Sequence, residues 1–218
     1  MPKRLALVHT VSTLPAVFKT LCAELLPGLD LFHIVDESLL QNTIRAGSLS
    51  KATARRLLGH LASAQEAGAS AVLVTCSSVG NAVDWSRSFI DIPVYRVDEP
   101  MAEAAVRTGA RIGVAATLQT TMTPTADLIR TKAGGLGKSV QISTKLCEGA
   151  FDANIAGDMA RHDRIVTEGL QQLLAQSDVI VLAQASMARV ADLLPPQKDR
   201  PPILSSPRLA VEHLAGVL

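Results

Sequence analysis

The sequence predicts an α/β protein with two doubly wound, Rossmann-like halves, each built on a mostly parallel sheet. Short runs rich in Val, Ile and Leu alternate with longer stretches of helical periodicity, a pattern typical of parallel strands joined by crossover helices. The alternation starts again beyond residues 97–110, so the same pattern occurs twice. Apolar residues make up 48% of the 218 residues, which is enough for a sizeable core.

In the first half, each apolar run is short enough for a buried strand and is followed by amphipathic sequence. We expect strands at residues 5–8, 31–35, 71–75 and 93–97. We expect helices at residues 16–26, 50–67, from about 78 onward, and 99–108. Residues 36–49 are predicted to be a polar loop.

Beyond residue 110, the expected strands are residues 111–115, 140–146, 179–183 and 202–204. The expected helices are 118–132, a stretch ending at 174, a short helix after 183, and 209–218, and we expect the closing strand and helix to return to the first half. We assign residues 1–97 with 203–218 to the first domain and residues 98–202 to the second. Residues 193–202 contain four prolines and mixed charge, which predicts a solvated loop.

Composition excludes several classes of function. The 21 basic and 20 acidic residues give a net charge of +1, which is not the electrostatic pattern of a nucleic-acid binder. Three cysteines without a CxxC pair argue against a disulfide scaffold and a zinc ribbon. No apolar run is long enough for a membrane span, and aromatic residues are only 3% of the chain. We expect a cytoplasmic protein that binds a small polar ligand.

Other motifs fail on their spacing. The segment Gly134-Gly135-Leu136-Gly137-Lys138-Ser139 lacks the first glycine of a phosphate-binding loop and leads into a strand. No GxGxxG sequence opens a helix, so dinucleotide binding has no support. The histidines show no HxxxH or HxH spacing, and no metal site is predicted.

Cys76 ends an apolar run, in the segment Thr75-Cys76-Ser77-Ser78. The carboxyl ends of parallel strands are where open α/β sheets bind ligands. The helix that follows offers unpaired N–H groups and the positive end of its dipole, both of which lower a thiol pKa. We therefore expect a reactive Cys76 thiolate, with Ser77 and Ser78 capping the helix or holding an anion. The alternative is a buried cysteine beside an ordinary cap.

Five segments occur in an order that spans nearly the whole chain. They are His9-Thr10, Thr75-Cys76-Ser77-Ser78, Val97-Asp98-Glu99-Pro100, Ile112-Gly113-Val114-Ala115-Ala116-Thr117 with Thr120, and the stretch from Asp178 to Ser186. In this order, the sequence resembles the cofactor-independent aspartate/glutamate racemase superfamily. That superfamily includes glutamate, aspartate and hydantoin racemases, maleate isomerase and arylmalonate decarboxylase.

The resemblance implies two α/β halves related by a pseudo-twofold axis around a cleft, without pyridoxal phosphate and without a metal. Two-base members place a cysteine on each side of the substrate's alpha carbon, so that one thiolate removes the proton and the opposite thiol returns one. Backbone N–H groups and Ser/Thr hydroxyls hold the carboxylate and the enediolate. Carried onto this sequence, the resemblance implies substrate-binding roles for His9, Thr10, Ser77, Ser78, Thr117, Thr120, Thr121 and Ala185.

The sequence departs from this pattern at Gln184, which stands where the second cysteine belongs. Gln184 and Ser186 are candidates for the missing catalytic group, although neither is a base without help. Cys147, which follows its own strand, is a third candidate; its alternative is a packed cysteine. His9 is a further acid–base candidate, and its alternative is a satisfied histidine at a strand end.

We therefore expect a racemase or isomerase that acts at the carbon alpha to the carboxylate of a small acid or amino acid. Cys76 would be its base or nucleophile. The position of this lone cysteine, in the first half, resembles that in maleate isomerase, in which the first-half cysteine is the nucleophile. A decarboxylase or lyase of the same superfamily is the next alternative. A small-acid binding protein without catalysis is the alternative from another class. A homodimer is the default assembly.

Overall fold

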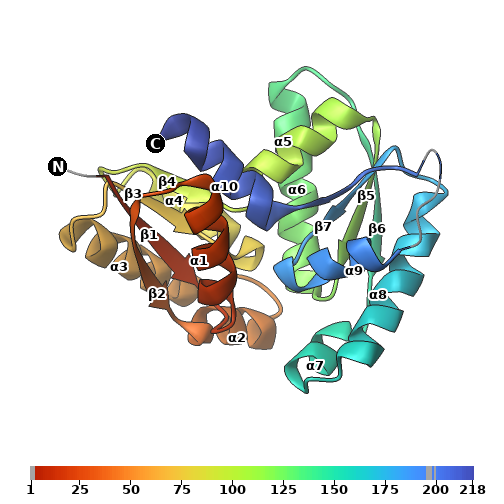
Figure 1. Ribbon diagram of the computed structural model, residues 1–218, viewed down its shortest axis with the longest axis horizontal. Coiled ribbons are helices and arrows are strands. Elements are labelled where there is room, and N and C mark those ends of the chain that lie inside the picture. Colours follow the sequence, from red (N-terminus) through yellow and green to blue (C-terminus); the bar gives the residue numbers. More distant parts are fainter. Residues whose placement is uncertain (1–2, 195–197, 199) are drawn as a thin grey trace. The chain divides into compact units, whose positions relative to one another are not determined.

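The computed structural model describes residues 3–194, 198 and 200–218. The chain folds into two compact units, Met1–Glu99 with Pro207–Leu218, and Pro100–Ser206. Within the described residues, each unit contains one four-stranded parallel sheet flanked by helices (Figure 1). The strand orders are β2-β1-β3-β4 and β6-β5-β7-β8. This architecture confirms the predicted α/β fold class, and the two sheets have the same topology.

The first unit is built on a sheet whose two faces carry different helices. Its strands are β1 (Arg4–His9), β2 (Asp30–Val35), β3 (Ala71–Val74) and β4 (Val94–Arg96). Its helices are α1 (Leu14–Leu25), α2 (Glu37–Ala46), α3 (Lys51–Glu66), the 3-10 helix η1 (Ser77–Val79), α4 (Gly80–Ser86) and α10 (Ser206–Val217).

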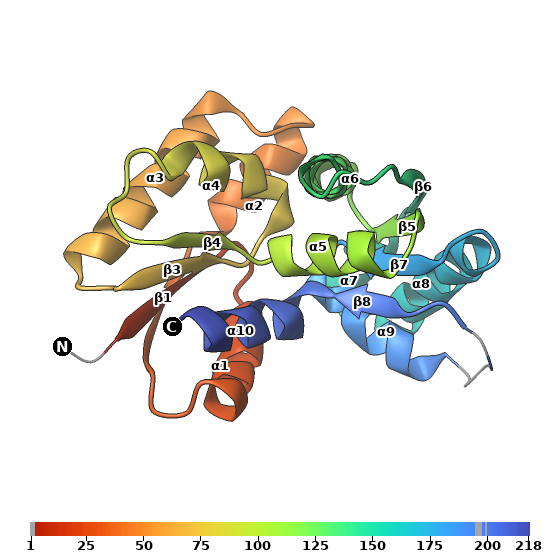
Figure 2. The same cartoon turned by 90° about the horizontal axis from the view of Figure 1, so that it is seen from above.

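Alternation along β1 explains the two layers of the first unit. Leu5 and Leu7 pack with α1 and α10, whereas Ala6 and Val8 pack with α2, α3 and α4 on the opposite face (Figure 2). Successive side chains of a strand point to opposite faces, so a strand buried on both faces reads as a continuous apolar run. β1 therefore forms the centre of this unit's core.

Helix α2 forms where the sequence analysis predicted a loop. Asp36 is its N-cap and accepts a hydrogen bond from the Ser38 N–H at 3.0 Å. Gly47 ends the helix with a φ of 69°, a left-handed conformation that favours glycine. Buried Leu39, Leu40 and Thr43 anchor one face of α2. The predicted loop was wrong because the polar residues that suggested it lie on the exposed face of a helix.

The second unit repeats the alternation of strands and helices. Its strands are β5 (Arg111–Ala116), β6 (Gln141–Leu146), β7 (Val179–Leu182) and β8 (Ile203–Ser205). Its helices are α5 (Glu99–Thr108), α6 (Gln119–Gly135), α7 (Ala150–Ile155), α8 (Met159–Leu174), the 3-10 helix η2 (Ala185–Met187) and α9 (Ala188–Leu193). No helix in the described residues is both long and apolar enough to span a membrane.

Strand β8 corrects the predicted domain boundary. The sequence analysis assigned residues 203–218 to the first half, but β8 pairs in parallel with β7, with Ile180 opposite Ile203. Only α10 returns to the first unit, where Ala210, Val211 and Leu214 join its core. The predicted loop at residues 193–202 includes residues 195–197 and 199, which lie outside the described chain.

In both sheets the chain reverses its direction of travel between the two inner strands. From β1 it moves outward to β2, then returns to β3 on the other side of β1; from β5 it moves to β6, then returns to β7. Such topological switch points leave a crevice at the carboxyl ends of the strands, where open α/β sheets bind ligands. Each unit therefore has one position in its fold where a ligand is expected.

A buried arginine supports the helix that follows Cys76. Arg96 on β4 is 3% exposed and forms a two-point ion pair with Asp98, through Nε at 3.0 Å and Nη2 at 2.9 Å. Its Nη1 donates to Asp84 of α4 at 2.5 Å. The guanidinium lies so close to Gly80, the first residue of α4, that a Cβ there would overlap it. Gly80 thus allows the ion pair to hold the start of α4.

We predict that Gly80→Ala lowers the free energy of unfolding by about 1–3 kcal/mol, because the new methyl group displaces a buried, paired guanidinium. Urea unfolding measures the change. Gly59→Ala in α3 is the matched control, since no atom lies within 4 Å of its added Cβ; it should stabilise the protein by about 0.5–1 kcal/mol. Equal stability of Gly80→Ala and the wild-type protein would show that Arg96 is not held against α4.

Candidate functional site

Cys76 lies at the switch point of the first sheet. It follows β3 by two residues and occupies the N-cap position of η1 in an extended conformation, with φ −135° and ψ 117°. Its side chain is partly exposed, whereas Cys22 and Cys147 are buried. Thr10, which follows β1, and Ser78 place their hydroxyls beside the sulfur, and the N–H groups of Ser78 and Val79 donate to it. Hydroxyl and amide donors thus surround one thiol.

The pKa of this thiol differs from the expectation. Burial raises the pKa of Cys76 above its ordinary value, and the hydrogen bonds from Thr10, Ser78 and Val79 only partly offset that rise. The sequence analysis expected a helix dipole to hold a thiolate. The N–H groups of Ser78 and Val79 do act in that direction, but burial outweighs them. Burial thus disfavours the Cys76 thiolate, although donors that stabilise an anion lie beside the sulfur.

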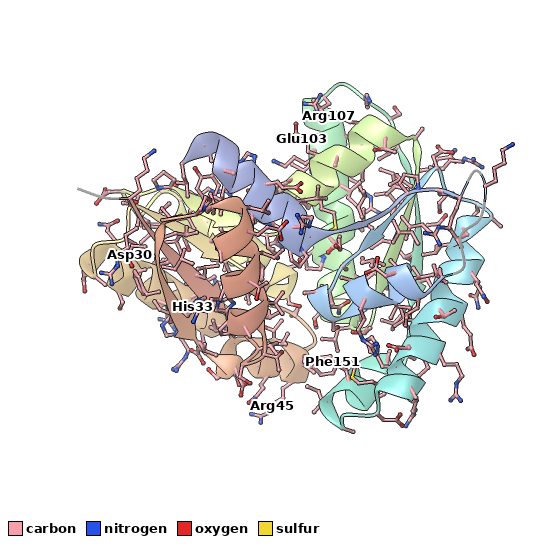
Figure 3. All side chains as sticks on the ribbon, in the orientation of Figure 1. Asp30, His33, Arg45, Glu103, Arg107 and Phe151 are labelled. Atoms are coloured by element: carbon pink, nitrogen blue, oxygen red, sulfur yellow. The ribbon has the colours of Figure 1, made fainter. Side chains whose placement is uncertain are left out.

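His9 belongs to a buried chain of hydrogen bonds. Its Nδ1 lies 2.8 Å from the Thr75 hydroxyl, and its Nε2 lies 2.9 Å from Nδ1 of His33 on β2. Figure 3 labels His33. The Thr75 hydroxyl donates to the Val8 carbonyl at 3.2 Å, so it accepts from His9 Nδ1–H. His9 Nε2 then accepts from His33. His9 is 0% exposed and both its ring nitrogens are occupied, so this geometry supports a structural role rather than substrate binding.

The remaining predicted residues of the first unit cluster around Cys76. Ser77 and Ser78 are 4% and 2% exposed, and Thr10 is 2% exposed. The Thr10 hydroxyl finds no oxygen or nitrogen partner within the described chain. Its hydrogen bond is therefore made to the Cys76 sulfur.

In the second unit, Gln184 follows β7 by two residues and lies at that unit's switch point. Its Oε1 accepts a hydrogen bond from the Thr117 backbone N–H at 2.9 Å. Three buried polar atoms of this region have no partner among the described residues: Gln184 Nε2, Thr117 Oγ1 and Thr120 Oγ1. Ala185 and Ser186 follow Gln184 in η2 and are partly exposed. Thr121 is buried, and its carbonyl accepts from the Thr125 hydroxyl.

Cys147 lies away from these groups. It is 1% exposed and packs in an apolar cluster with Val166 and Leu170 of α8. Its sulfur lies so close to Gly169 of α8 that a Cβ there would meet it. Burial raises the pKa of Cys147 to about 11. These contacts favour the packed alternative and do not support Cys147 as the second catalytic group.

The backbone shows that Cys76 and Gln184 occupy equivalent places in the two repeats. The Thr75 N–H donates to the Val8 carbonyl at 3.0 Å, and the Ala183 N–H donates to the Ala115 carbonyl at 2.9 Å. In each unit the next residue is extended and caps a 3-10 helix, η1 after Cys76 and η2 after Gln184. The same register makes Thr10 equivalent to Thr117.

One polar cluster was missed by the sequence analysis. His162 is 0% exposed on the buried face of α8, with Nδ1 2.9 Å from Asp163 Oδ1, while its Nε2 has no partner in the described chain. Asp163 also accepts two hydrogen bonds from Arg189 of α9, both at 2.6 Å. His162 could have been noticed as a histidine at a buried position of the α8 apolar stripe, four residues before Val166.

The described residues contain no group of three or more His, Cys, Asp or Glu side chains that could hold a metal ion. The pairs that do form are ion pairs, such as Asp36 with Arg56 and Asp98 with Arg96. The candidate sites are therefore built from hydroxyl, amide and thiol groups.

Comparison with known proteins links this geometry to one family. A family model described as Asp/Glu/Hydantoin racemase matches residues 9–214. Glutamate racemase isoform RacE1 from Bacillus anthracis is 17% identical, with a TM-score of 0.77 over 99% of this chain and 81% of that one. Allantoin racemase from Klebsiella pneumoniae is 17% identical, with a TM-score of 0.65 over 99% of this chain and 87% of that one. Aspartate racemase from Picrophilus torridus is 10% identical, with a TM-score of 0.72 over 98% and 94%. No curated protein matches the sequence.

We predict that iodoacetamide labels Cys76 before Cys22 and Cys147, because only Cys76 is partly exposed. Since burial raises the Cys76 pKa above its ordinary value, the labelling rate should keep rising with pH through the neutral range. Mass spectrometry of labelled peptides across a pH series measures both. A rate that levels off below about pH 8 would show a lowered pKa and contradict the structure.

We also predict a specific pH dependence of stability. Burial lowers the pKa of His9 from 6.5 to about 4, with His33 adding to the shift. Between these values the unfolded chain binds a proton that the folded protein does not, so stability falls as pH drops from 6.5 to about 4. Urea unfolding of His9→Asn across this window should show a shallower slope than wild type. An unchanged slope would mean that His9 is not buried as a neutral group.

Proposed function

Because this chain belongs to the Asp/Glu/Hydantoin racemase family and is thus an enzyme of isomerase type, we propose that it acts at the carbon alpha to the carboxylate of a small acid or amino acid. Cys76 would be the base or nucleophile. All three cysteines of the chain are free, which suits the reducing cytoplasm that we propose as the compartment of this protein. The family match supports the reaction class, and the geometry around Cys76 supports the residue.

The observation that carries this proposal is the set of donors at the Cys76 sulfur. Hydroxyls of Thr10 and Ser78 and the N–H groups of Ser78 and Val79 surround a partly exposed thiol at a topological switch point. Prearranged donors of this kind stabilise negative charge on sulfur or on a developing oxyanion. Neither of the other two cysteines has such surroundings, because both are buried in apolar clusters.

The proposed reaction transfers a proton between the alpha carbon of the substrate and the Cys76 sulfur. In the forward direction the Cys76 thiolate takes the alpha proton, the C–H electron pair moves into the carboxylate to form an enediolate, and Cys76 becomes a thiol. In the reverse direction the thiol returns the proton to carbon. Because burial raises the pKa of Cys76, the thiol must first lose its proton to solvent water, and the surrounding donors then stabilise the thiolate. The protonated thiol is the form that gives a proton to carbon in the reverse direction.

Two observations favour a second reaction of the same family, decarboxylation. Gln184 has no titratable proton and occupies the place equivalent to Cys76. Burial, which raises the pKa of Cys76, favours its protonated thiol. Loss of CO2 from a malonate-type acid leaves an enediolate, to which the Cys76 thiol can donate its proton. The resulting thiolate regains a proton from water. This reaction needs only one protein acid–base group.

We predict that Cys76→Ser abolishes activity while the fold survives. Alpha-proton exchange with deuterated water, followed by NMR over a panel of small diacids, amino acids, hydantoins and malonates, measures the first reaction; CO2 release from the malonates measures the second. The loss should be at least about 100-fold, because proton transfer by a positioned side chain contributes about that much or more.

Cys147→Ala is the matched control. It removes a thiol that packs against α8 and should retain activity. Full activity of Cys76→Ser would reject Cys76 as the catalytic group. Binding of panel compounds without exchange or CO2 release would instead favour the non-catalytic binding protein.

A further inference from the structure

Glu37, the first residue of α2, contacts the turn that follows β1. The Ser12 backbone N–H donates to Glu37 Oε1 at 3.1 Å, and the Ser12 hydroxyl bonds the same carboxylate. The hydroxyl and the N–H of Ser12 hold the pKa of Glu37 below its ordinary value, so the carboxylate is charged when it accepts them. Ser12 lies two residues after Thr10, whose hydroxyl bonds the Cys76 sulfur. A short segment of the first unit therefore links Glu37 to the thiol.

The start of α2 is held in place by the residue before Glu37. The Asp36 N–H donates to the His9 carbonyl at 3.0 Å and so continues the ladder between β1 and β2. The Asp36 carboxylate accepts from the Ser38 hydroxyl at 2.6 Å and lies 2.7 Å from Nε2 of His60 on α3. Asp36 is 8% exposed, and hydrogen bonds to a charged group are stronger than those between neutral groups. Glu37 thus starts from a fixed position.

The turn between β1 and α1 has weaker bonds of its own. Thr13, the N-cap of α1, makes no side-chain capping bond within the described residues, although such bonds commonly fix the start of a helix. The Leu14 N–H reaches the Val11 carbonyl only at 3.3 Å, and Thr13 is exposed. A turn with few bonds of its own depends on outside contacts, and Glu37 supplies two of them.

We propose that Glu37 is a positioning residue: by fixing the turn after β1, it holds the Thr10 hydroxyl against the Cys76 sulfur. A donor held at hydrogen-bond distance favours the charged form of its acceptor, so this contact makes the thiol more reactive. The inference deepens the proposed function and rests on it for the role of Cys76 in catalysis. The reactivity of the thiol can nevertheless be measured without a substrate.

The test is the rate at which iodoacetamide labels Cys76 in the full chain, measured by mass spectrometry over a pH series. Thr10→Val removes the donor, which should raise the thiol pKa by about one to two units. Because a thiolate of higher pKa is also more nucleophilic, the rate near neutral pH should fall by only about threefold to tenfold. Glu37→Ala removes the acceptor that holds the turn, and its rate should fall at least about twofold.

Glu37→Gln separates the hydrogen bond from the charge. Its amide oxygen still accepts the Ser12 N–H, whereas removal of a negative charge favours a nearby thiolate. Glu37→Gln should therefore label at least as fast as the wild-type protein, while Glu37→Ala labels more slowly. In the Thr10→Val background, Glu37→Ala should change the rate by no more than about 1.5-fold, because the hydroxyl that Glu37 positions is gone.

Glu66→Ala is the matched control. Glu66 is exposed and ends α3 at the opposite edge of the sheet, where the next carbonyl, that of Ala67, accepts from Arg4 at the start of β1. The same chemical change there should leave the labelling rate of Cys76 unchanged. Urea unfolding of each variant shows that labelling is measured on folded protein.

Two results would overturn the inference: equal labelling rates of Glu37→Ala and Glu37→Gln, or the same loss from Glu37→Ala with and without the Thr10 hydroxyl. Failure of the proposed function gives a different pattern. If Cys76 is not catalytic but the inference holds, Cys76→Ser keeps its activity and the labelling rates differ as predicted. If the inference fails but the proposed function holds, Cys76→Ser loses activity and Glu37→Ala labels Cys76 as fast as the wild-type protein.

Discussion

The parallel hydrogen-bond ladder between the two inner strands of each sheet is the constraint on which the rest of the structure depends. Val8 lies opposite Val74 in the first sheet, and Ala115 lies opposite Leu182 in the second. This register brings the residues after β1 and β3 to one edge, and it does the same for β5 and β7. A one-residue slip would move every side chain of a strand to the opposite face. In both units the hydrogen bonds between the two inner strands end at equivalent residues, and a candidate site follows directly after them.

On this shared framework, the two units place chemically different groups. The first unit has a thiol whose burial opposes ionisation while hydroxyls and amides favour it. The second unit has an amide whose oxygen is already used and whose nitrogen is free within the described chain. A thiol can exchange a proton, whereas the free NH2 of an amide only donates a hydrogen bond. The two equivalent places therefore differ in whether their side chain can transfer a proton.

The sequence allowed the fold class to be predicted because strands buried on both faces are apolar throughout, as in residues 5–8. Cys76 could be recognised for the same reason, since it interrupts such a run at its carboxyl end. Helix α2 was missed because its exposed polar residues obscured the buried ones, and β8 was misassigned because a three-residue edge strand has too little pattern to show its partner. The pairing of His9 with His33 depends on the register of β1 and β2, which no local pattern reveals.

The sequence also could not predict the pKa of Cys76 or the role of Cys147. Burial outweighs the donors at Cys76, and that balance depends on groups from separate strands. Whether Cys147 faces a ligand or α8 depends on Gly169, which leaves room for its sulfur. The alternatives for Gln184 could be stated from sequence, but the direction of its amide required the Thr117 hydrogen bond.

The central claim, that the two repeats offer equivalent places of which only the one at Cys76 exchanges protons, is tested most directly by Gln184→Ala. Alpha-proton exchange should be measured at saturating concentrations of the responsive compound in the substrate panel, so that a change in affinity does not affect the rate. The account predicts that Gln184→Ala exchanges the alpha proton as fast as the wild-type protein does. A loss of exchange in Gln184→Ala as large as that in Cys76→Ser would contradict it.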